Sequence, residues 1–407
     1  MNNSFYQRSV LLLVAMVLTR WAAAQDLGPA PLLPESERVF QLRQLAEVNV
    51  PAIDTSSRSA VVAAFYSAYN ASEGFAVGWD GNTANCVLGV NSTNHKEATL
   101  RRVNYFRAMA GLPGVVALDD ARSTKCIRAA MMMSAHGGLN HNPPGTWTCY
   151  SADGAEAAGK SNLALGREGP GAVDLYMDDH GSGNEPVGHR RWILYPPQVV
   201  MGTGSVPAQS GKSSANALWV LATFGARPPS PEFVAWPSPG YFPYQLLPRL
   251  SSRWSFSRPN ASFGGTTVSV TQNGTPLTVG IVSTTATGYG DNTIVWTVAG
   301  VPTTAPASDR PYEVTLNNVL IDGSSRSFSY TVTVIDPAVP NLEARFALDE
   351  ITIAWPAGPT GFLLQTGAVS GAGVTWGNAD LSSTPVGNEH RVTITPAEGA
   401  QLFRLRK

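Results

Sequence analysis

The sequence carries little charge for its length. Only 14% of its 407 residues are charged, and 28 Lys and Arg against 29 Asp and Glu leave a formal net charge of −1. A chain without a basic excess does not attract nucleic acid or anionic lipid through its overall charge. We therefore expect no nucleic-acid partner.

Cysteine is scarce as well. The chain has three cysteines, Cys86, Cys126 and Cys149, which are too few for a scaffold built on disulfides, so packing must supply most of the stability. In an oxidising compartment one pair can close, and one thiol is then left over. Cys126 lies at an apolar position of a predicted helix. It is either a small buried residue or the partner of Cys149, and the sequence does not decide between the two.

Long hydrophobic runs are absent after the first residues. At the start, Arg8 precedes the apolar run Val10–Leu18, and Ala22–Ala24 stand before Gln25. A basic start, a short apolar core and a small-residue stop are typical of a secretory signal peptide, here residues 1–24. The alternative is a membrane anchor, which needs ~20 apolar residues, about twice this length. We therefore expect a secreted protein, extracellular or in the cell envelope, without an integral membrane span.

The chain is too long for one ordinary core, and its length predicts several domains. Changes in periodicity and in proline content indicate where the boundaries lie. After the signal peptide we expect a helical lead-in at 25–80, an α+β domain at 81–226, a β-sandwich at 227–336 and a small C-terminal β module at 341–407.

Helical periodicity dominates the first half of the chain. The predicted helices run from Pro34–Glu37 to about Val48, over Ser57–Tyr69, from about Leu100 to Gly111, from Asp119 or Asp120 to Gly137-Gly138, and over Ala172–Asp179. Strand-like runs follow at Val199–Val206 and Ala217–Phe224. Helices first and strands later indicate an α+β arrangement.

The second half alternates polar and apolar residues, as short strands do. The predicted strands are Thr267–Thr271, Thr293–Val298, Tyr312–Leu316 and Ser327–Val334 in the sandwich, and Ile351–Trp355, Phe362–Thr366, Arg391–Thr395 and Leu402–Leu405 in the C-terminal module. Asp322-Gly323 between two such runs is typical of a hairpin turn. Proline-rich linkers follow Gly225 and span Pro337–Pro340, and we expect the sandwich to be immunoglobulin-like.

Four of the six histidines lie near one another in the sequence, among several acids. The histidines are His136, His141, His180 and His189, and the acids are Glu156, Asp178, Asp179 and Glu185. Imidazoles and carboxylates together can bind a divalent metal or act as acid and base. The sequence contains neither H-E-x-x-H nor G-x-S-x-G, so the usual helical zinc-protease and nucleophile-elbow patterns are absent. On spacing alone, histidines that only make hydrogen bonds are the simpler interpretation.

Two of these acids, Asp178 and Asp179, stand at the end of a predicted helix. Carboxylates at a helix C-terminus oppose the local dipole, so two without partners would be mildly unfavourable. The pattern therefore favours a functional or paired role for at least one of them.

Six motifs between Leu100 and Gly225 carry a further signal. They are Arg102–Arg107 followed by Gly111–Pro113, Met132–His141, the S-N-L-A of Ser161–Ala164, Tyr176–Asp179, the G-H-R-R-W-I-L-Y-P of Gly188–Pro196, and Met201–Gly204 with Val220–Gly225. In this order they resemble the CAP superfamily, which includes cysteine-rich secretory proteins, antigen 5, plant pathogenesis-related proteins and bacterial SCP-like extracellular proteins. The resemblance implies that 81–226 is a CAP domain, an α-β-α sandwich with a large cleft.

The resemblance also implies a site. Many members of the family place two histidines and two acids in the cleft, and some bind zinc there. Carried over to this chain, the histidines are His141 and His189, and Asp179 is the acid of the third helix. Ser161 stands where the family motif has Glu, and a hydroxyl cannot supply that charge. Glu156, in what we predict to be a longer loop, is a candidate replacement.

Three functions are compatible with these residues. The favoured hypothesis is that the CAP cleft binds an extracellular or envelope ligand, such as a peptide, glycan or lipid, while the β modules attach or space the domain. The alternative is a metal-assisted hydrolase or peptidase. In it, His141 and His189 hold zinc, and Asp179 or Glu156 is a ligand or general base. A third hypothesis is a structural surface protein with a vestigial cleft.

Overall fold

The computed structural model describes residues 26–32, 46–284, 288–347, 350–370, 373–379, 381, 383–387, 389–395 and 402–407. The predicted signal peptide, residues 1–24, and most of the helix predicted from Pro34–Glu37 lie outside these residues. That helix does not reach Val48 as predicted, because Ala46–Glu47 form strand β1. Within the described part of the chain, no helix is both long and apolar enough to cross a membrane.

A five-stranded sheet with helices on both faces forms the α+β part. Its strand order is β1-β2-β4-β5-β3. The remaining strands are β2 (Ala117–Leu118), β3 (Ser161–Leu165), β4 (Val200–Val206) and β5 (Ala215–Trp219), and the helices are α2 (Thr93–Met109), α3 (Asp120–His136), α4 (Ala152–Lys160), α5 (Gly169–Asp178) and α6 (Gly188–Ile193). β2 and β4 are parallel, whereas β4, β5 and β3 are antiparallel.

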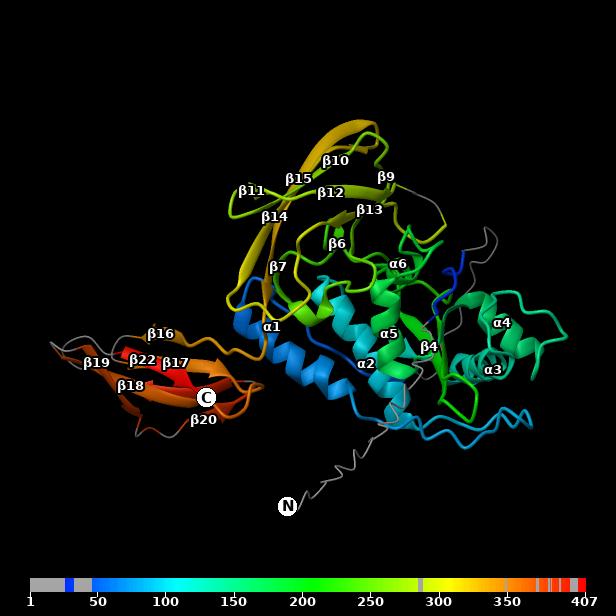
Figure 1. Ribbon diagram of the computed structural model, residues 1–407, viewed down its shortest axis with the longest axis horizontal. Coiled ribbons are helices and arrows are strands. Elements are labelled where there is room, and N and C mark those ends of the chain that lie inside the picture. The colour runs from blue at the N-terminus through cyan, green and yellow to red at the C-terminus, as the bar shows by residue number, and fades with distance from the viewer. Residues whose placement is uncertain are drawn as a thin grey trace, which may run out of the picture.

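The side chains of β5 show how the two faces are covered. Leu218 belongs to the apolar cluster that contains the buried residues of α2 and α5. Its neighbours Ala217 and Trp219 belong to a second cluster, which contains those of α3 and α4. Successive strand residues point to opposite faces, so the sheet lies between two helical layers. The predicted α-β-α sandwich is confirmed, and Figure 1 shows the two layers around β4.

Local signals in the sequence set the ends of α3. The Asp119 side chain accepts a hydrogen bond from the Arg122 amide at the N-terminus, and Gly137 ends the helix with φ +81°. Both ends are as predicted. Gly204 lets α3 approach the sheet, since a Cβ there would lie 2.1 Å from the Ile127 amide nitrogen.

The cysteines resolve the alternatives left open by the sequence. Cys86 and Cys149 form a disulfide across 63 residues, and Cys126 is a free, buried thiol. Burial raises the pKa of Cys126 to about 12, so it is a small packing residue rather than a reactive one. The alternative pairing of Cys126 with Cys149 is wrong.

The predicted helix over Ser57–Tyr69 is present in two forms. It comprises the α-helix α1 (Arg58–Ala64) and the π-helical η1 (Phe65–Tyr69), and the 3₁₀-helical η2 (Asn70–Ser72) continues it. The Ser57 hydroxyl caps α1. These elements pack against α2, so the lead-in is joined to the core of the α+β part.

The β-sandwich consists of two sheets with orders β11-β10-β14-β15-β7, where β9 pairs with β14, and β12-β13-β8-β6. Its elements are β6 (Val234–Trp236), β7 (Gly240–Pro243), η3 (Tyr244–Leu246), β8 (Arg253–Ser257), β9 (Ala261–Ser262), β10 (Thr267–Gln272), β11 (Thr275–Pro276), β12 (Val279–Ser283), β13 (Thr293–Val298), β14 (Arg310–Ile321) and β15 (Ser324–Ile335). The Asp322-Gly323 hairpin is confirmed, with Ile321 opposite Ser324. The rings of Phe256 and Phe328 lie 5.1 Å apart and join the two sheets.

The sandwich and the α+β part share one apolar cluster, which extends from Leu27 to Ile335. A buried hydrogen bond also links the two regions, since the guanidinium of Arg190 in α6 donates to the Arg253 carbonyl of β8 at 2.8 Å. The prolines after Gly225 therefore connect two regions that pack against each other.

The C-terminal module is a lobe with its own small core (Figure 1). Its strands are β16 (Glu343–Ala347), β17 (Glu350–Pro356), β18 (Leu363–Ser370), β19 (Gly373–Asn378), β20 (Thr384–Val386), β21 (Glu389–Ile394) and β22 (Leu402–Arg406), in sheets β16-β17-β21-β20 and β19-β18-β22. The linker before it is held by Arg58, which donates to the carbonyls of Asp336 and Val339.

Candidate functional site

The predicted residues His189 and Asp179 form a buried pair. His189 Nδ1 lies 2.8 Å from Asp179 Oδ1, and both side chains are 0% exposed. The other Asp179 oxygen accepts from the Arg190 amide at 3.1 Å. Asp179 ends α5 with φ +55°, a conformation that Asp tolerates better than most residues. The ring of His189 stacks on Tyr176. Its Nε2 is buried and has no hydrogen-bond partner among the residues that the structure describes.

Asp178 is paired as well, although in a different way. Its two carboxylate oxygens accept from the amides of Leu250 and Ser251, each at 2.8 Å. The expectation that at least one acid at this helix end has a partner is therefore confirmed. Asp178 joins α5 to the loop before β8, whereas Asp179 faces α6.

His141 lies in the loop after α3, between two carbonyl oxygens. Its Nδ1 is 2.6 Å from the Ala158 oxygen and its Nε2 is 2.6 Å from the Pro29 oxygen. Burial lowers the pKa of His141, although the two carbonyls oppose this, and the nearby His189 lowers it further. A neutral imidazole has a single N–H, so only one carbonyl receives a hydrogen bond at a time.

The Pro29 carbonyl belongs to a short segment, residues 26–32, that crosses this part of the domain. The Asn184 side chain donates to the Gly28 carbonyl at 2.7 Å, and the Trp192 indole donates to the Pro31 carbonyl at 2.6 Å. At the start of the segment, Asp26 and Leu165 exchange two main-chain hydrogen bonds of 3.1 and 2.8 Å. We call His141, Leu165, Asn184, Gly188 and Trp192 the segment site.

Side chains of the segment are anchored too. Leu27 is 2% exposed and Ala30 is 5% exposed. Gly188 lies beneath Ala30, because a Cβ at this position would come within 2.6 Å of the Ala30 Cβ and 2.7 Å of the Tyr289 ring. Any larger residue at 188 would therefore displace the segment or the Tyr289 ring.

The other predicted site residues lie elsewhere. The stretch around Glu156 is helix α4, not the predicted loop, and the Glu156 carboxylate pairs with Lys125 and Lys160. His136 stacks on Trp147 with ring centroids 3.9 Å apart. Glu156 and His136 therefore contribute to the packing and ion pairs of their own helices and do not belong to the site.

The zinc site that the resemblance implies fits only part of the donor set. His189 is oriented as a metal ligand would be, with Nδ1 on Asp179 and Nε2 without a partner among the described residues, whereas both His141 nitrogens face carbonyl oxygens. No group of three or more His, Cys, Asp or Glu side chains in the described part of the chain is arranged to hold a metal ion. Zinc at His141, His189 and Asp179 stays a prediction.

No motif in the sequence indicated that Trp192 and Asn184 would contact residues 26–32. From the sequence, Trp192 is expected to be a packing residue, and it is indeed fully buried. The one available signal was Pro29 and Pro31, because a proline-containing segment without apolar periodicity does not form a strand of the sheet and has to be held by side chains.

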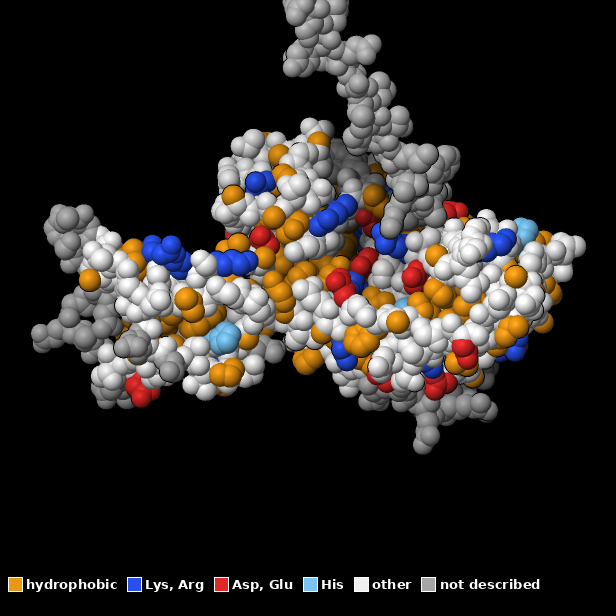
Figure 2. All heavy atoms as spheres, turned by 60° about the horizontal axis from the view of Figure 1, so that its bottom comes forward, with side chains coloured by type: hydrophobic (Ala, Val, Ile, Leu, Met, Phe, Trp, Pro, Cys, Tyr) orange, Lys and Arg blue, Asp and Glu red, His pale blue; other side chains and the backbone are white. Residues whose placement is uncertain are grey.

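A separate cavity of about 870 Å³ opens between η1, α2, α5 and the end of η3 with the loop 247–250 that follows it. Figure 2 shows the surface hollowed there, with acidic and basic side chains beside apolar ones. Its charged lining residues are Glu73, Arg102, Arg167, Asp174, Asp178 and Arg249. The signs balance, so the cavity does not favour a ligand of either charge.

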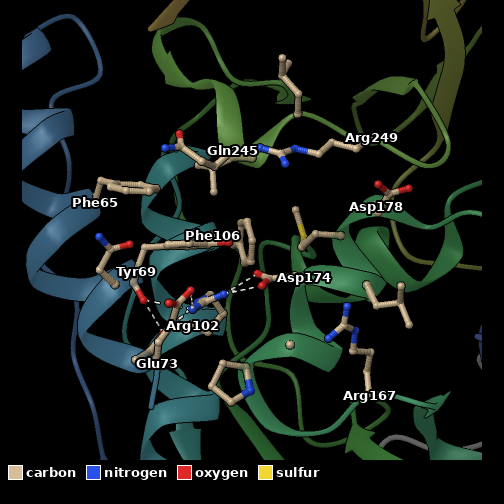
Figure 3. Close-up of a pocket in the computed structure, with 18 of the residues that line it drawn as sticks. Phe65, Tyr69, Glu73, Arg102, Phe106, Arg167, Asp174, Asp178, Gln245 and Arg249 are labelled. Atoms are coloured by element: carbon tan, nitrogen blue, oxygen red, sulfur yellow. Dashed lines mark hydrogen bonds and ion pairs between the residues drawn. The ribbon is translucent and has the colours of Figure 1, made fainter. Parts of the chain in front are cut away.

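One wall of this cavity is an ion pair with a structural role. Arg102 contacts both Asp174 oxygens, at 2.6 and 2.5 Å, and also bonds to Ser72 and to the Tyr69 carbonyl. Figure 3 shows these contacts on one side of the cavity, with Gln245 and Arg249 across from them. Burial raises the pKa of Asp174, and Arg102 opposes that rise. The pair joins α2 to α5.

The buried histidines predict a pH dependence of stability. Burial lowers the pKa of both His95 and His141 in the folded chain. The unfolded chain then binds more protons, so the free energy of unfolding falls as the pH drops through about 6.5, and the loss is complete below the folded pKa values. The slope is at most about 1.4 kcal/mol per pH unit for each histidine. Urea denaturation between pH 5 and 8 measures it.

The variant His141→Gln is the control for this prediction. Glutamine does not titrate, so the pH dependence should become shallower by the contribution of one histidine. An unchanged slope in the variant would show that His141 has the same pKa in the folded and unfolded chain.

Comparison with known proteins agrees with the architecture. Residues 100–223 match the family model described as the cysteine-rich secretory protein family, CAP. No curated protein matches the chain. The matched residues run from within α2 to just beyond β5 in the α-β-α sandwich, and they contain all five residues of the segment site. Residues 100–223 of the chain are therefore a CAP domain.

Proposed function

We propose that this is a secreted protein whose CAP domain binds an extended peptide at the segment site, while the β regions attach or space the domain. The observation that carries the proposal is that Asn184 and Trp192 each donate to a carbonyl of one short segment, while His141 Nε2 lies 2.6 Å from a third carbonyl of it. Carbonyl oxygens are common to all peptides, so a foreign chain with the same backbone path can use the same donors.

The nature of these donors supports a peptide over the other ligands considered. A main-chain exchange of two hydrogen bonds with Leu165 adds the edge of β3 to the site. Pairing with a strand edge needs backbone N–H and C=O groups, which peptides have and lipids and most glycans lack at this spacing. The hydrolase alternative stays a prediction, because both His141 nitrogens face carbonyl oxygens, although the Nε2 of His189 has no partner among the described residues.

The test needs a full-length chain whose own segment cannot dock. Ala30→Glu provides it, since a carboxylate would be forced against Gly188 and Tyr289 where Ala30 is now buried. Leu32→Glu is the matched control, because Leu32 is 59% exposed. We expect a fluorescent peptide with the sequence of residues 26–32 to bind Ala30→Glu at least about tenfold more tightly than the wild type or Leu32→Glu, as measured by anisotropy.

A further change identifies where the peptide binds. Trp192→Phe keeps the aromatic ring and removes only the N–H that donates to Pro31. In the Ala30→Glu background this change should lower the affinity for the peptide by roughly fivefold to tenfold, which is the effect of losing one buried hydrogen bond. Absence of peptide binding in a correctly folded Ala30→Glu chain would contradict the proposed function and leave residues 26–32 as a permanent part of the fold.

A further inference from the structure

The contacts of the segment indicate which peptides the site would select. Of the bonds that the segment makes with side chains of the site, all use carbonyl oxygens, those of Gly28, Pro29 and Pro31. Pro29 and Pro31 have no N–H to offer. At residues 28–31 the site bonds only to carbonyls, so a proline there loses no bond, whereas a β-ladder would lose one at each proline. The N–H that pairs with Leu165 belongs to Asp26, outside this core.

The prolines also fix the backbone that presents these carbonyls. The pyrrolidine ring sets φ near −65° at Pro29 and Pro31, and Ala30 is restricted to extended conformations because a proline follows it. Such a segment is close to polyproline II before it binds, so less conformational entropy is lost on docking. Recognition of proline-rich segments by aromatic-lined grooves uses the same physics.

The residue between the two prolines meets a steric limit. Ala30 is 5% exposed and packs over Gly188, where an added Cβ would already lie 2.6 Å from the Ala30 Cβ and 2.7 Å from the Tyr289 ring, so we expect a longer side chain at 30 to collide there. Pro29, by contrast, is exposed, so its ring contributes through backbone stiffness rather than through burial. The site therefore selects a peptide that has a small residue at this position and a stiff backbone.

We infer that the segment site binds proline-rich peptides with a Pro–small–Pro core, and that residues 28–31 are the built-in example which an external peptide replaces. The inference rests on the proposed function, since it names the ligand class of the same site. The single charge of the segment is Asp26, so binding should depend little on salt.

The experiment compares three peptides on the Ala30→Glu chain. The first has the sequence of residues 26–32, the second replaces Pro29 and Pro31 with Ala, and the third replaces Ala30 with Leu. We expect the second and third to bind about tenfold more weakly than the first, because one loses its preorganised backbone and the other collides with Gly188 and Tyr289.

The outcomes separate this inference from the proposed function. If none of the peptides binds, the proposed function fails and the inference falls with it. If the first and second bind equally, the site takes extended peptides without regard to proline, and only the inference is overturned. If the first and third peptides bind equally, the site does not require a small residue between the prolines, and again only the inference is overturned.

A second measurement covers the case in which Ala30→Glu does not fold. In the wild-type background, replacing Pro29 and Pro31 with Ala should increase the rate at which a protease cleaves within 26–32 about tenfold, since the segment would leave the site more often. The control is Leu32→Ala, which alters an exposed residue of the same segment. Equal cleavage of the wild type and the double variant would contradict the inference.

Discussion

Replacing Arg102 with Met is expected to lower the free energy of unfolding by roughly 2 to 4 kcal/mol. The guanidinium is 1% exposed and pairs with Asp174, and it also bonds to Ser72 and to the Tyr69 carbonyl. Methionine fills much of the volume but leaves the carboxylate without a counter-charge. The loss is smaller than for a fully buried pair because the Asp174 side chain is 36% exposed in the cavity. Urea denaturation followed by tryptophan fluorescence measures it.

Two further variants isolate the cause of this loss. Arg101→Met changes the preceding residue of α2, whose side chain makes one hydrogen bond, to the Ala71 carbonyl, and it should cost less than about 1 kcal/mol. Adding Asp174→Asn to Arg102→Met removes the unpaired charge, so the double variant should have a free energy of unfolding about 1 kcal/mol higher than that of Arg102→Met. A double variant as unstable as Arg102→Met would show that packing against Tyr69, and not the ion pair, sets the effect.

The parts of the fold that the sequence predicts well are those set by local periodicity and by end signals. The strand Thr293–Val298 has the predicted bounds, because alternating apolar residues face one core. Asp119 and Gly137 bound α3 as predicted, because capping depends on only a few neighbouring residues. The CAP motifs added the layer order, which periodicity alone does not contain.

Helix α4 shows why another part was missed. Its sequence, Ala152–Lys160, has two glycines and four alanines, so it lacks the large apolar residues that make a helical stripe visible. It is nevertheless held, because Ala157 and Ala158 are fully buried against α3. Tertiary packing decides the structure of such a segment, and the loop predicted around Glu156 was therefore wrong.

The segment site could not be predicted for a related reason. The contact between His141 and Pro29 spans 112 residues, and that between Trp192 and Pro31 spans 161. Nothing in the local sequence of either partner indicates the other. The sequence did direct attention to His141 and His189, but it assigned them to each other and to acids, whereas His141 bonds to main-chain carbonyls.

Replacing Asp179 with Ala is the second change with a large expected effect, about 3 to 5 kcal/mol of lost stability. The side chain is fully buried, and its two oxygens accept from His189 and from the Arg190 amide. Without it both donors lose their partner. Burial lowers the pKa of Arg190 to about 10, and Asp179 is the charge that opposes this lowering most, so the variant removes that support from a buried cation.

The variant Asp179→Asn distinguishes lost charge from lost hydrogen bonds. Asparagine tolerates the left-handed conformation at this position and keeps one accepting oxygen, so we expect a loss of only about 1 to 2 kcal/mol. Glu185→Gln, at a side chain that is 45% exposed, should change stability by less than about 1 kcal/mol.

The Asp179–His189 pair lies next to the segment site, because His189 follows Gly188. Loosening the pair should therefore also lower the affinity for the peptide in the Ala30→Glu background. If Asp179→Ala destabilised the fold but left peptide affinity unchanged, the pair would support the core alone and have no part in shaping the segment site.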